Sequence, residues 1–301
     1  MNYRKHTVVG LGELLWDLFP AGKQLGGAPA NFAYITNILG DNGVPASRVG
    51  DDALGGEALQ RLAQSGLRTD LVQHDRVHPT GTVKVAMNGG QHQFEIRENV
   101  AWDFLEWNED WAELASEADA VCFGSLAQRS PASRATIFRF LNTTRAEAVR
   151  VFDVNLRQNF YSKEILEQSM KLATIVKMNH EELPKIARLF GITTRAERDG
   201  AREMLSLYGL KLVCITRGNC GSLLVSAEEC SQHAGFKVKV IDTVGAGDAF
   251  TAALVHGYLR GRSLDEINET ANRVGAWVAS QSGGMPRIRD EGLQQMLMEI
   301  E

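Results

Sequence analysis

The chain lacks most of the features that mark secreted, membrane-spanning or nucleic-acid-binding proteins. Its 301 residues include only four cysteines, and none of these forms a Cys-x-x-Cys pair or a zinc-binding spacing. No stretch approaches the roughly 18 apolar residues of a membrane span, and the N-terminal residues show no signal-peptide pattern. The formal net charge of −5 leaves no basic excess for nucleic acid or an anionic membrane. We therefore expect a cytoplasmic protein with reduced, buried cysteines and with neither nucleic acid nor membrane as a partner.

Two widespread nucleotide-binding motifs are also absent. No Gly-x-x-x-x-Gly-Lys-Ser/Thr sequence occurs, which argues against a P-loop. Gly10-Leu11-Gly12 starts like a dinucleotide-binding fingerprint, but Leu15 occupies the position of the third glycine and no helical pattern follows directly. Any phosphate-binding turn must therefore lie elsewhere in the chain.

From residue 119 onward, the chain contains a regular alternation of short apolar runs and helical patterns. This rhythm is typical of an α/β protein with a mostly parallel central sheet that helices cover on both faces. We expect strands at residues 120–123, 149–153, 174–178, 212–216, 222–225 and 237–241. No repeat, low-complexity tract or linker composition interrupts the chain, so residues 1–301 are expected to form one domain.

A different pattern precedes this region. Residues 81–87 and 92–97 read as two strands around Asn88-Gly89-Gly90, which is a strong hairpin signal. A hairpin within an α/β chain suggests a small β lid, formed from about residues 13–24 and 81–99. The exposed strand edges of such a lid could pair with a second copy of the chain and give a homodimer.

One glycine-rich turn has the features of a phosphate site. Residues 242–250 read Asp-Thr-Val-Gly-Ala-Gly-Asp-Ala-Phe, after a strand-like run and before a run that is apolar on nearly every face. Gly245, Ala246 and Gly247 can turn main-chain N–H groups toward an anion, and a helix start adds partial positive charge. Asp248 could then take the proton of a hydroxyl while these amides hold a phosphoryl group. The alternative is that Asp248 only caps the helix.

Two motifs resemble the signatures of one protein family. Residues 242–250 are similar to the C-terminal signature of the ribokinase-like (PfkB) sugar and nucleoside kinases. Residues 26–33, Gly-Gly-Ala-Pro-Ala-Asn-Phe-Ala, resemble the N-terminal signature of the same family. The segments at residues 12–17, 98–103 and 153–157 most resemble those of bacterial fructokinases. The resemblance covers essentially the whole chain.

This resemblance implies a ribokinase-like fold and an ATP-dependent kinase that phosphorylates a hydroxyl of a small sugar. Fructose is the expected acceptor. Kinases for 2-keto-3-deoxygluconate, tagatose phosphate or a nucleoside are the nearest alternatives, and a catalytically silent sugar sensor is a further one. Asp248 and the glycine turn weigh against the sensor, because a protein that only binds sugar does not need the base.

Several polar residues are candidates for contact with the sugar. Asp17 interrupts an apolar run, where an unpaired carboxylate is costly to bury, and the resemblance implies that it bonds sugar hydroxyls. The Asn31 amide can donate to and accept from one hydroxyl pair, and the nearby Gly27 permits close approach. Arg157 could bind a phosphate or a sugar oxygen through its guanidinium N–H groups, or it could be an ordinary surface arginine. Weaker candidates are Gln128, Asn155 and the hairpin residue Phe94, which could equally be a packing residue.

The metal candidates follow an expected strand end. Asn179 and Glu182 come directly after residues 174–178, at the edge where open α/β sheets bind ligands. Their oxygens suit Mg²⁺, often through water, and the resemblance implies that they lie near Mg²⁺ and the phosphates. Asp242, the second acid of the glycine turn, is a further metal candidate. Asn179 has the alternative role of capping the next helix.

The resemblance also implies an ATP site. Thr216, Gly218 and Gly221 would line it, although by composition they form a simple hairpin turn. Asn272 would flank the adenine, with a solvated helix residue as the alternative, and residues 280–286 would close over the base. Arg287 stands where relatives that bind a monovalent cation often carry a small residue. Because an arginine would repel a cation, this residue argues against dependence on potassium (K⁺).

Overall fold

The computed structural model of the chain describes residues 4–20, 22–88, 91–193 and 196–287, with the side chains of all of these except 85–88 and 91–94. None of the helices within these residues is long and apolar enough to cross a membrane.

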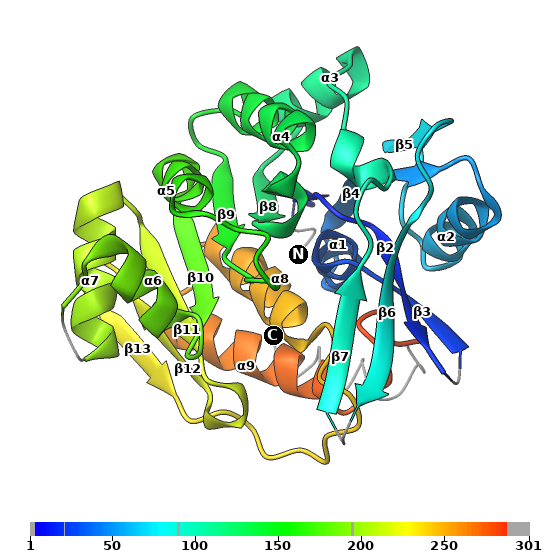
Figure 1. The fold of residues 1–301 in the computed structure, drawn as a ribbon. Coiled ribbons are helices and arrows are strands. Elements are labelled where there is room, and N and C mark those ends of the chain that lie inside the picture. Colours follow the sequence, from blue (N-terminus) through cyan, green and yellow to red (C-terminus); the bar gives the residue numbers. More distant parts are fainter. Residues whose placement is uncertain (1–3, 21, 89–90, 194–195, 288–301) are drawn as a thin grey trace.

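The main element is a nine-stranded sheet (Figure 1). Its strands are β1 (Thr7–Leu11), β4 (Asn42–Gly50), β5 (Val72–Asp75), β8 (Ala120–Gly124), β9 (Val149–Asp153), β10 (Ile175–Asn179), β11 (Leu212–Thr216), β12 (Ser222–Val225) and β13 (Cys230–His233). They lie in the order β13-β12-β11-β10-β9-β8-β1-β4-β5. All pairs from β11 to β5 are parallel, whereas β12 and β13 add an antiparallel edge.

Helices cover both faces of the sheet (Figure 1). One face carries α1 (Ala28–Ile38), α2 (Ala53–Gln64), α8 (Ala246–Leu259) and α9 (Leu264–Ala279). The other carries α3 (Glu109–Glu117), α4 (Pro131–Thr143), α5 (Lys163–Leu172), α6 (Leu183–Phe190) and α7 (Glu197–Tyr208). Short 3-10 helices are η1 (Ala101–Phe104), η2 (Leu126–Arg129) and η3 (Gly218–Cys220). This arrangement confirms the expected α/β class.

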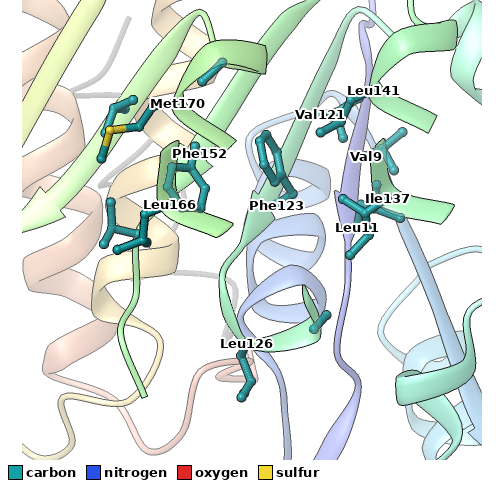
Figure 2. Close-up of a cluster of buried hydrophobic side chains, with 14 of the residues drawn as sticks. Val9, Leu11, Val121, Phe123, Leu126, Ile137, Leu141, Phe152, Leu166 and Met170 are labelled. Carbon is teal, nitrogen blue, oxygen red and sulfur yellow. The ribbon is translucent and has the colours of Figure 1, made fainter. Parts of the chain in front are cut away.

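Each face of the sheet has its own hydrophobic core, because successive strand residues point in opposite directions. Val8 packs with α1 and α8, whereas Val9 packs in the core on the other side. Figure 2 shows part of that second core, in which Phe123 of β8 and Phe152 of β9 stack with ring centroids 5.3 Å apart. Burial on both faces explains why these strands read as continuous apolar runs.

Two buried helices carry the glycine motifs to one edge of the sheet. α1 begins after Gly27, whose φ is 110°, and has Pro29 in its first turn, where proline is favoured. α8 is buried along residues 249–255, as its uniformly apolar sequence predicts. The first turns of both helices line one small depression together with the carboxyl ends of β8 and β9.

A second, smaller sheet has the order β3-β2-β6-β7. Its strands are β2 (Leu15–Phe19), β3 (Gly22–Gly26), β6 (Gly81–Asn88) and β7 (Gln91–Ile96). β6 and β7 form the expected antiparallel hairpin, and β6 pairs in parallel with β2. Figure 1 shows this sheet beside α1, next to the main sheet.

The prediction of a strand at residues 237–241 was wrong. The main chain there has no regular structure, and β13 forms instead from an earlier segment. The Ile241 and Asp242 N–H groups both donate to the carbonyl of Ala279, at the end of α9, instead of to a neighbouring strand. Because no partner strand covers this segment, Val240 and Ile241 remain 55% and 62% exposed despite their alternating pattern.

All four cysteines are free thiols. Cys122 and Cys214 are buried, as their apolar strands predict, and Cys230 is partly buried. Cys220 is exposed, which corrects the expectation of burial, because it lies in η3 between β11 and β12.

Candidate active site

The glycine turn forms the start of α8. Gly245 is the N-cap residue with a left-handed φ of 78°, and a Cβ atom there would overlap the main chain of Gly284. Both constraints require glycine at this position. The helix begins at Ala246, so Asp248 lies within its first turn and does not occupy the N-cap position. The capping alternative for Asp248 is therefore wrong.

Asp248 is joined to the N-terminal motif by a hydrogen bond. Asn31 Nδ2 donates to Asp248 Oδ2 over 2.8 Å, across 217 residues of sequence. Asn31 is 3% exposed, and its Oδ1 is a buried atom with no hydrogen-bond partner among the described residues. The structure thus brings together the two motifs of the sequence and leaves one amide oxygen unused.

The surroundings of Asp248 raise its pKa toward neutral pH. Burial raises the pKa of Asp248 to about 6, and the charge of Asp153 raises it further, while the Asn31 bond, Lys177 and Arg157 oppose the rise. A carboxyl with this pKa is ionised at neutral pH and still accepts a proton readily, which suits a general base.

A buried cation lies directly beneath the glycine turn. Lys177 of β10 is 7% exposed, and its Nζ lies 3.1 and 2.9 Å from the two carboxylate oxygens of Asp153. A Cβ atom placed on Gly247 would lie only 3.1 Å from Lys177 Nζ. Thr251 completes the cluster by donating to Asp153 over 3.3 Å and to the carbonyl of Gly247 over 2.9 Å.

This cluster keeps Lys177 charged. Burial disfavours the ammonium, but the neighbouring Asp153 carboxylate outweighs it and raises the pKa of Lys177 above its usual value. Sequence reasoning missed Lys177. A signal was present, because a lysine within the apolar strand β10 must find a partner if it is buried.

Asp242 fixes the turn to the loop that follows α9. Its Oδ1 accepts from the N–H of Val244 over 3.0 Å, and its Oδ2 accepts from the N–H of Gly283 over 3.0 Å. The Tyr34 hydroxyl donates to the carbonyl of Pro286 over 2.6 Å and anchors the end of the same loop. Asp242 therefore serves as a link between two main-chain segments, and both of its oxygens are in use.

The same loop packs over the Asn31 amide. A Cβ atom on Gly284 would lie 2.6 Å from Asn31 Cγ, so only glycine allows this approach. Residues 280–286, expected to close over a base, thus contact the sugar-side motif in this structure. Arg287, at the end of the loop, is exposed.

Asp17 lies beside the glycine motif at the start of α1, and Arg157 is near enough to Asp17 and Asp248 to affect the pKa of both carboxyls. Asp17 of β2 is partly exposed, and burial raises its pKa to about 6, with Arg157 opposing and Asp242 reinforcing the rise. A Cβ atom on Gly26 would lie 2.8 Å from Asp17 Oδ2, which keeps the carboxyl close to the glycine motif. The Arg157 side chain is exposed, and its charge acts on both Asp17 and Asp248.

The structure places the weaker candidates for sugar contact in different environments. Asn155 adopts a left-handed φ of 40° and lines the depression that Asp248 also lines. Gln128 is fully buried, and its Nε2 donates to the carbonyl of Gly124 and to Ser169 over 2.8 and 2.9 Å. The structure therefore gives Gln128 a packing role and does not bring it to the site. The Phe94 side chain lies outside the described residues.

Asn179 and Glu182 organise the end of β10. Asn179 Oδ1 accepts from the N–H groups of Glu181 and Glu182, each over 2.9 Å. The N-cap of α6 is Glu182, so the alternative that Asn179 caps this helix is wrong. Glu182 is buried, and its two oxygens accept from the N–H groups of Leu156 and Asn179 over 2.7 and 2.9 Å. Burial raises the pKa of Glu182, although Lys177 opposes this.

The metal candidates do not form a protein cage. Within the described ranges, no three or more His, Cys, Asp or Glu residues are placed to hold one ion. Glu182 and Asp242 each use both carboxylate oxygens on main-chain N–H groups. An ion at this edge would therefore need most of its ligands from a bound phosphate or from water, which is common for Mg²⁺.

The expected ATP residues form a turn and a buried network. Gly218 and Gly221 have left-handed φ values of 58° and 80° in the turn that follows Thr216, which confirms the hairpin between β11 and β12. Asn272 is buried, and its Nδ2 donates to Ser222 Oγ and to the carbonyl of Asn268, each over 2.7 Å. The Asn272 amide thus ties α9 to β12 in this structure.

The cavities differ sharply in size. The depression beside Asp248 measures about 10 Å³, roughly the room for one water, and is lined by Ala28, Pro29, Phe32, Cys122, Phe123, Gly124, Asp153, Asn155, Asp248 and Thr251. A cavity of about 490 Å³ lies against α6 and α7, where His180, Arg188 and Glu197 contribute polar groups. We assign the site to the smaller depression, because the convergent carboxyls, cation and helix start lie there.

The chain is similar to sugar kinases over nearly its whole length. Residues 11–290 match the model of the pfkB family carbohydrate kinases. An uncharacterized sugar kinase of Pyrococcus horikoshii is 30% identical over 97% of this chain and 96% of its own length. The crystal structure of that kinase in complex with ATP matches with a TM-score of 0.83 at 29% identity, over 99% of this chain and 100% of the other.

Fructokinases are also among the relatives. The fructokinase of Escherichia coli is 31% identical over 92% of this chain and 94% of its own length. The structure of Vibrio cholerae O395 fructokinase with fructose, ADP and a calcium ion has a TM-score of 0.77 at 26% identity and covers 98% of each chain. These relationships confirm the expected family and the ribokinase-like fold class.

Proposed function

Because the chain belongs to the pfkB family of carbohydrate kinases, we propose that it transfers the γ-phosphoryl group of ATP to a hydroxyl of a small sugar, with fructose as the first candidate. The observation that carries this proposal is the hydrogen bond from Asn31 to Asp248 at the glycine-built start of α8. It holds a carboxyl with a pKa of about 6 in the first turn of α8, and the start of a helix favours bound anions.

Asp248 would take the proton of the acceptor hydroxyl as its oxygen attacks the γ-phosphorus. The bond between that phosphorus and the bridging oxygen breaks, and ADP leaves with the electron pair. The N–H groups of Gly245 and Gly247 would hold the phosphoryl oxygens at the positive end of α8. The Ala246 N–H group, expected to do the same, donates instead to the carbonyl of Thr243 over 3.3 Å. Lys177, beneath Gly247, adds a fixed positive charge that favours the phosphate groups.

The nucleotide would extend from this turn toward β11 and β12. The hairpin turn with Thr216, Gly218 and Gly221 is the proposed ATP loop, and the exposed apolar residues Val240 and Ile241 suit the faces of a base. Asn272 would support the base-binding surface indirectly, since its amide already donates a hydrogen bond to Ser222 of β12.

Magnesium would arrive with the phosphates of ATP and neutralise part of their charge. Asn179 and Glu182 would reach the ion through water, since both Glu182 oxygens already accept main-chain N–H bonds. Asp242 would act by holding the turn against the loop that contains Gly283. The exposed Arg287 lies at the end of that loop and would repel a cation, which disfavours a potassium requirement.

The small sheet would act as a lid within a single domain. Asp17 lies on β2 of this sheet, so closure over the sugar would bring the carboxyl to its hydroxyls and exclude water from the reaction. The edge strands β3 and β7 each pair on one side only within the described sheet, so their outer edges could pair with a second copy. Light scattering over a concentration series tests the homodimer, and a monomer at every concentration would exclude it.

The exposed Arg157 favours a second candidate acceptor. Its charge acts on Asp17 and Asp248, and a guanidinium in this place also suits an acceptor that carries a carboxylate. A 2-keto-3-deoxygluconate kinase is therefore the alternative to a fructokinase.

A panel of about twenty sugars, sugar acids and nucleosides with ATP and Mg²⁺ tests these assignments. ATP consumption and the mass of the product are followed for each acceptor. Turnover of fructose supports the fructokinase assignment. If only another acceptor is phosphorylated, that acceptor replaces fructose as the assigned substrate. No turnover with any acceptor would overturn the kinase proposal in favour of a sugar sensor.

A further inference from the structure

A second buried carboxyl lies beside the proposed site, and neither sequence motif assigns it a role. Glu13 follows the end of β1, which lies between β4 and β8 as the third strand from the β5 edge, and precedes β2 of the small sheet. It is only 3% exposed, between Leu11 and Leu14, which are fully buried. A glutamate at such a place is unusual unless its carboxyl is paired or used.

One oxygen of this carboxyl is unused. Glu13 Oε2 is buried and has no hydrogen-bond partner among the described residues. Burial raises the pKa of Glu13 to about 7, while the main-chain N–H groups of Glu13 itself and of Ala28, at the start of α1, oppose the rise. Gly27, at the N-cap of α1, packs so closely on the Glu13 carbonyl that a Cβ atom would overlap it. The main chain at Glu13 is thus held against the start of α1, one turn before Asn31.

Glu13 lies next to the depression, because Gly27, which packs on the Glu13 carbonyl, directly precedes Ala28 and Pro29 of the depression's lining. Asp248, at the start of α8, and Arg157, after β9, both act on the ionisation of Glu13. Glu13 in turn acts on Cys122, which lines the same depression as Asp248. Glu13 is therefore buried directly behind the start of α1 that lines the depression, close enough for its charge and that of Asp248 to affect one another.

The unused oxygen needs a partner that arrives with a ligand. A buried polar atom without a hydrogen bond destabilises the free protein, and a ligand hydroxyl would supply the missing bond. Asp248 already serves the hydroxyl that reacts, because it lies at the phosphate-binding turn. We infer that Glu13 binds a second hydroxyl of the acceptor sugar and thereby helps to select it. This inference rests on the proposed kinase function and assigns a specificity-determining residue within that site.

Two variants separate binding from support of α1. Glu13→Gln keeps a carbonyl oxygen for the Ala28 N–H group and a polar end for the sugar. Glu13→Met has nearly the same length but offers no hydrogen bond to either partner. We expect Glu13→Met to raise the acceptor KM at least tenfold and to leave the ATP KM within twofold. Glu13→Gln should stay within about threefold of wild type for both.

The decisive experiment combines these variants with deoxy forms of the acceptor that the wild type phosphorylates. For one deoxy position, the wild type and Glu13→Gln should show a KM penalty of tenfold or more, whereas Glu13→Met should show almost none. If Glu13 had only a structural role, its substitution would change the KM of every deoxy form and of ATP alike. Glu164→Gln, the same change on the exposed surface of α5, is the matched control and should match the wild type throughout.

The outcomes distinguish the two proposals. If the wild type turns over an acceptor and no deoxy penalty depends on residue 13, the Glu13 inference is wrong and the kinase assignment stands. If the penalty disappears only in Glu13→Met, both stand. If the wild type phosphorylates no acceptor, the kinase proposal fails and the role of Glu13 fails with it.

Discussion

The two ends of α8 use buried carboxyls in opposite ways. At its last turn, His256 Nδ1 and Arg260 hold Asp41, with contacts of 2.7, 2.8 and 2.9 Å, and the His6 N–H group adds a fourth. At its first turn, Asp248 has Asn31 as its side-chain partner. Burial opposes ionisation at both ends. The hydrogen-bond partners of Asp41 nevertheless hold its pKa far below the usual range, whereas the pKa of Asp248 rises to about 6.

This contrast separates stability from reactivity within one helix. The Asp41 end is a closed ion-pair network, in which every charged group has its partner. The other end collects Glu13, Asp17 and Asp248, whose pKa values lie between about 6 and 7. Incomplete pairing costs stability and leaves groups ready for a proton or a ligand, which is typical of an active site.

The largest expected effect comes from Asp248→Asn. Loss of the base should lower kcat by about 10²–10⁴-fold, since general base catalysis contributes on that scale. The thermal unfolding temperature should not fall, because the amide replaces a carboxyl that is only partly paired. A coupled ATP assay and a thermal scan measure both effects. Wild-type turnover in this variant would remove the distinction between the two ends of α8.

Lys177→Met should lower kcat by about 10²-fold, because the cation beneath the phosphate-binding turn is lost. It should also destabilise the protein by leaving Asp153 buried without its partner. The double variant Lys177→Met/Asp153→Asn is the control. It should recover the unfolding temperature but not kcat, and recovery of both would reduce the pair to a structural role.

Asp41→Asn should lower the stability of the protein and leave its activity unchanged. Breaking the contacts to Arg260 and His256 should lower the free energy of unfolding by about 3 kcal/mol, the lower end of the range for a broken buried pair. Denaturant unfolding measures the loss. The kcat and KM of the remaining folded protein should match those of the wild type, and a change in KM would show that the two ends are coupled.

The smallest expected effect is a difference in pH dependence. The pKa of Asp248 is raised from 3.8 to about 6, so this carboxyl costs no stability below about pH 4 and an increasing amount as the pH rises toward 6. Asp248→Asn should therefore unfold at the wild-type temperature at pH 4 and a few degrees higher at pH 8. The contribution of Asp41 has the opposite sign, since it is present above about pH 4 and is lost only as the pH falls toward its lowered pKa.

Local patterns made the frame of the site predictable from the sequence. The glycine turn, the buried helix after it and the Pro29 helix start depend on residue types that strongly restrict the backbone. The same local rules failed for residues 237–241, where an alternating pattern had no neighbouring strand to pair with. Whether such a run becomes a strand depends on the tertiary structure, because β-propensity reflects packing against neighbours.

The roles of single polar residues were harder to predict. Gln128 and Asn272 resembled ligand contacts, but each uses its amide in a buried network with residues far away in the sequence. Glu13 and Lys177 were missed for the converse reason. Their importance depends on burial and on neighbours from other strands and helices, which a single sequence does not reveal.

The most direct test of a base at the glycine turn is the pH profile of kcat/KM for the acceptor at saturating ATP and Mg²⁺. The account predicts a constant value above neutrality and a tenfold fall per pH unit below about 6. Asn31→Leu removes a hydrogen bond that lowers the pKa of Asp248, so it should move the midpoint to higher pH with the same nucleotide present. A flat wild-type profile from pH 5 to 8, or a midpoint that Asn31→Leu leaves unchanged, would contradict it.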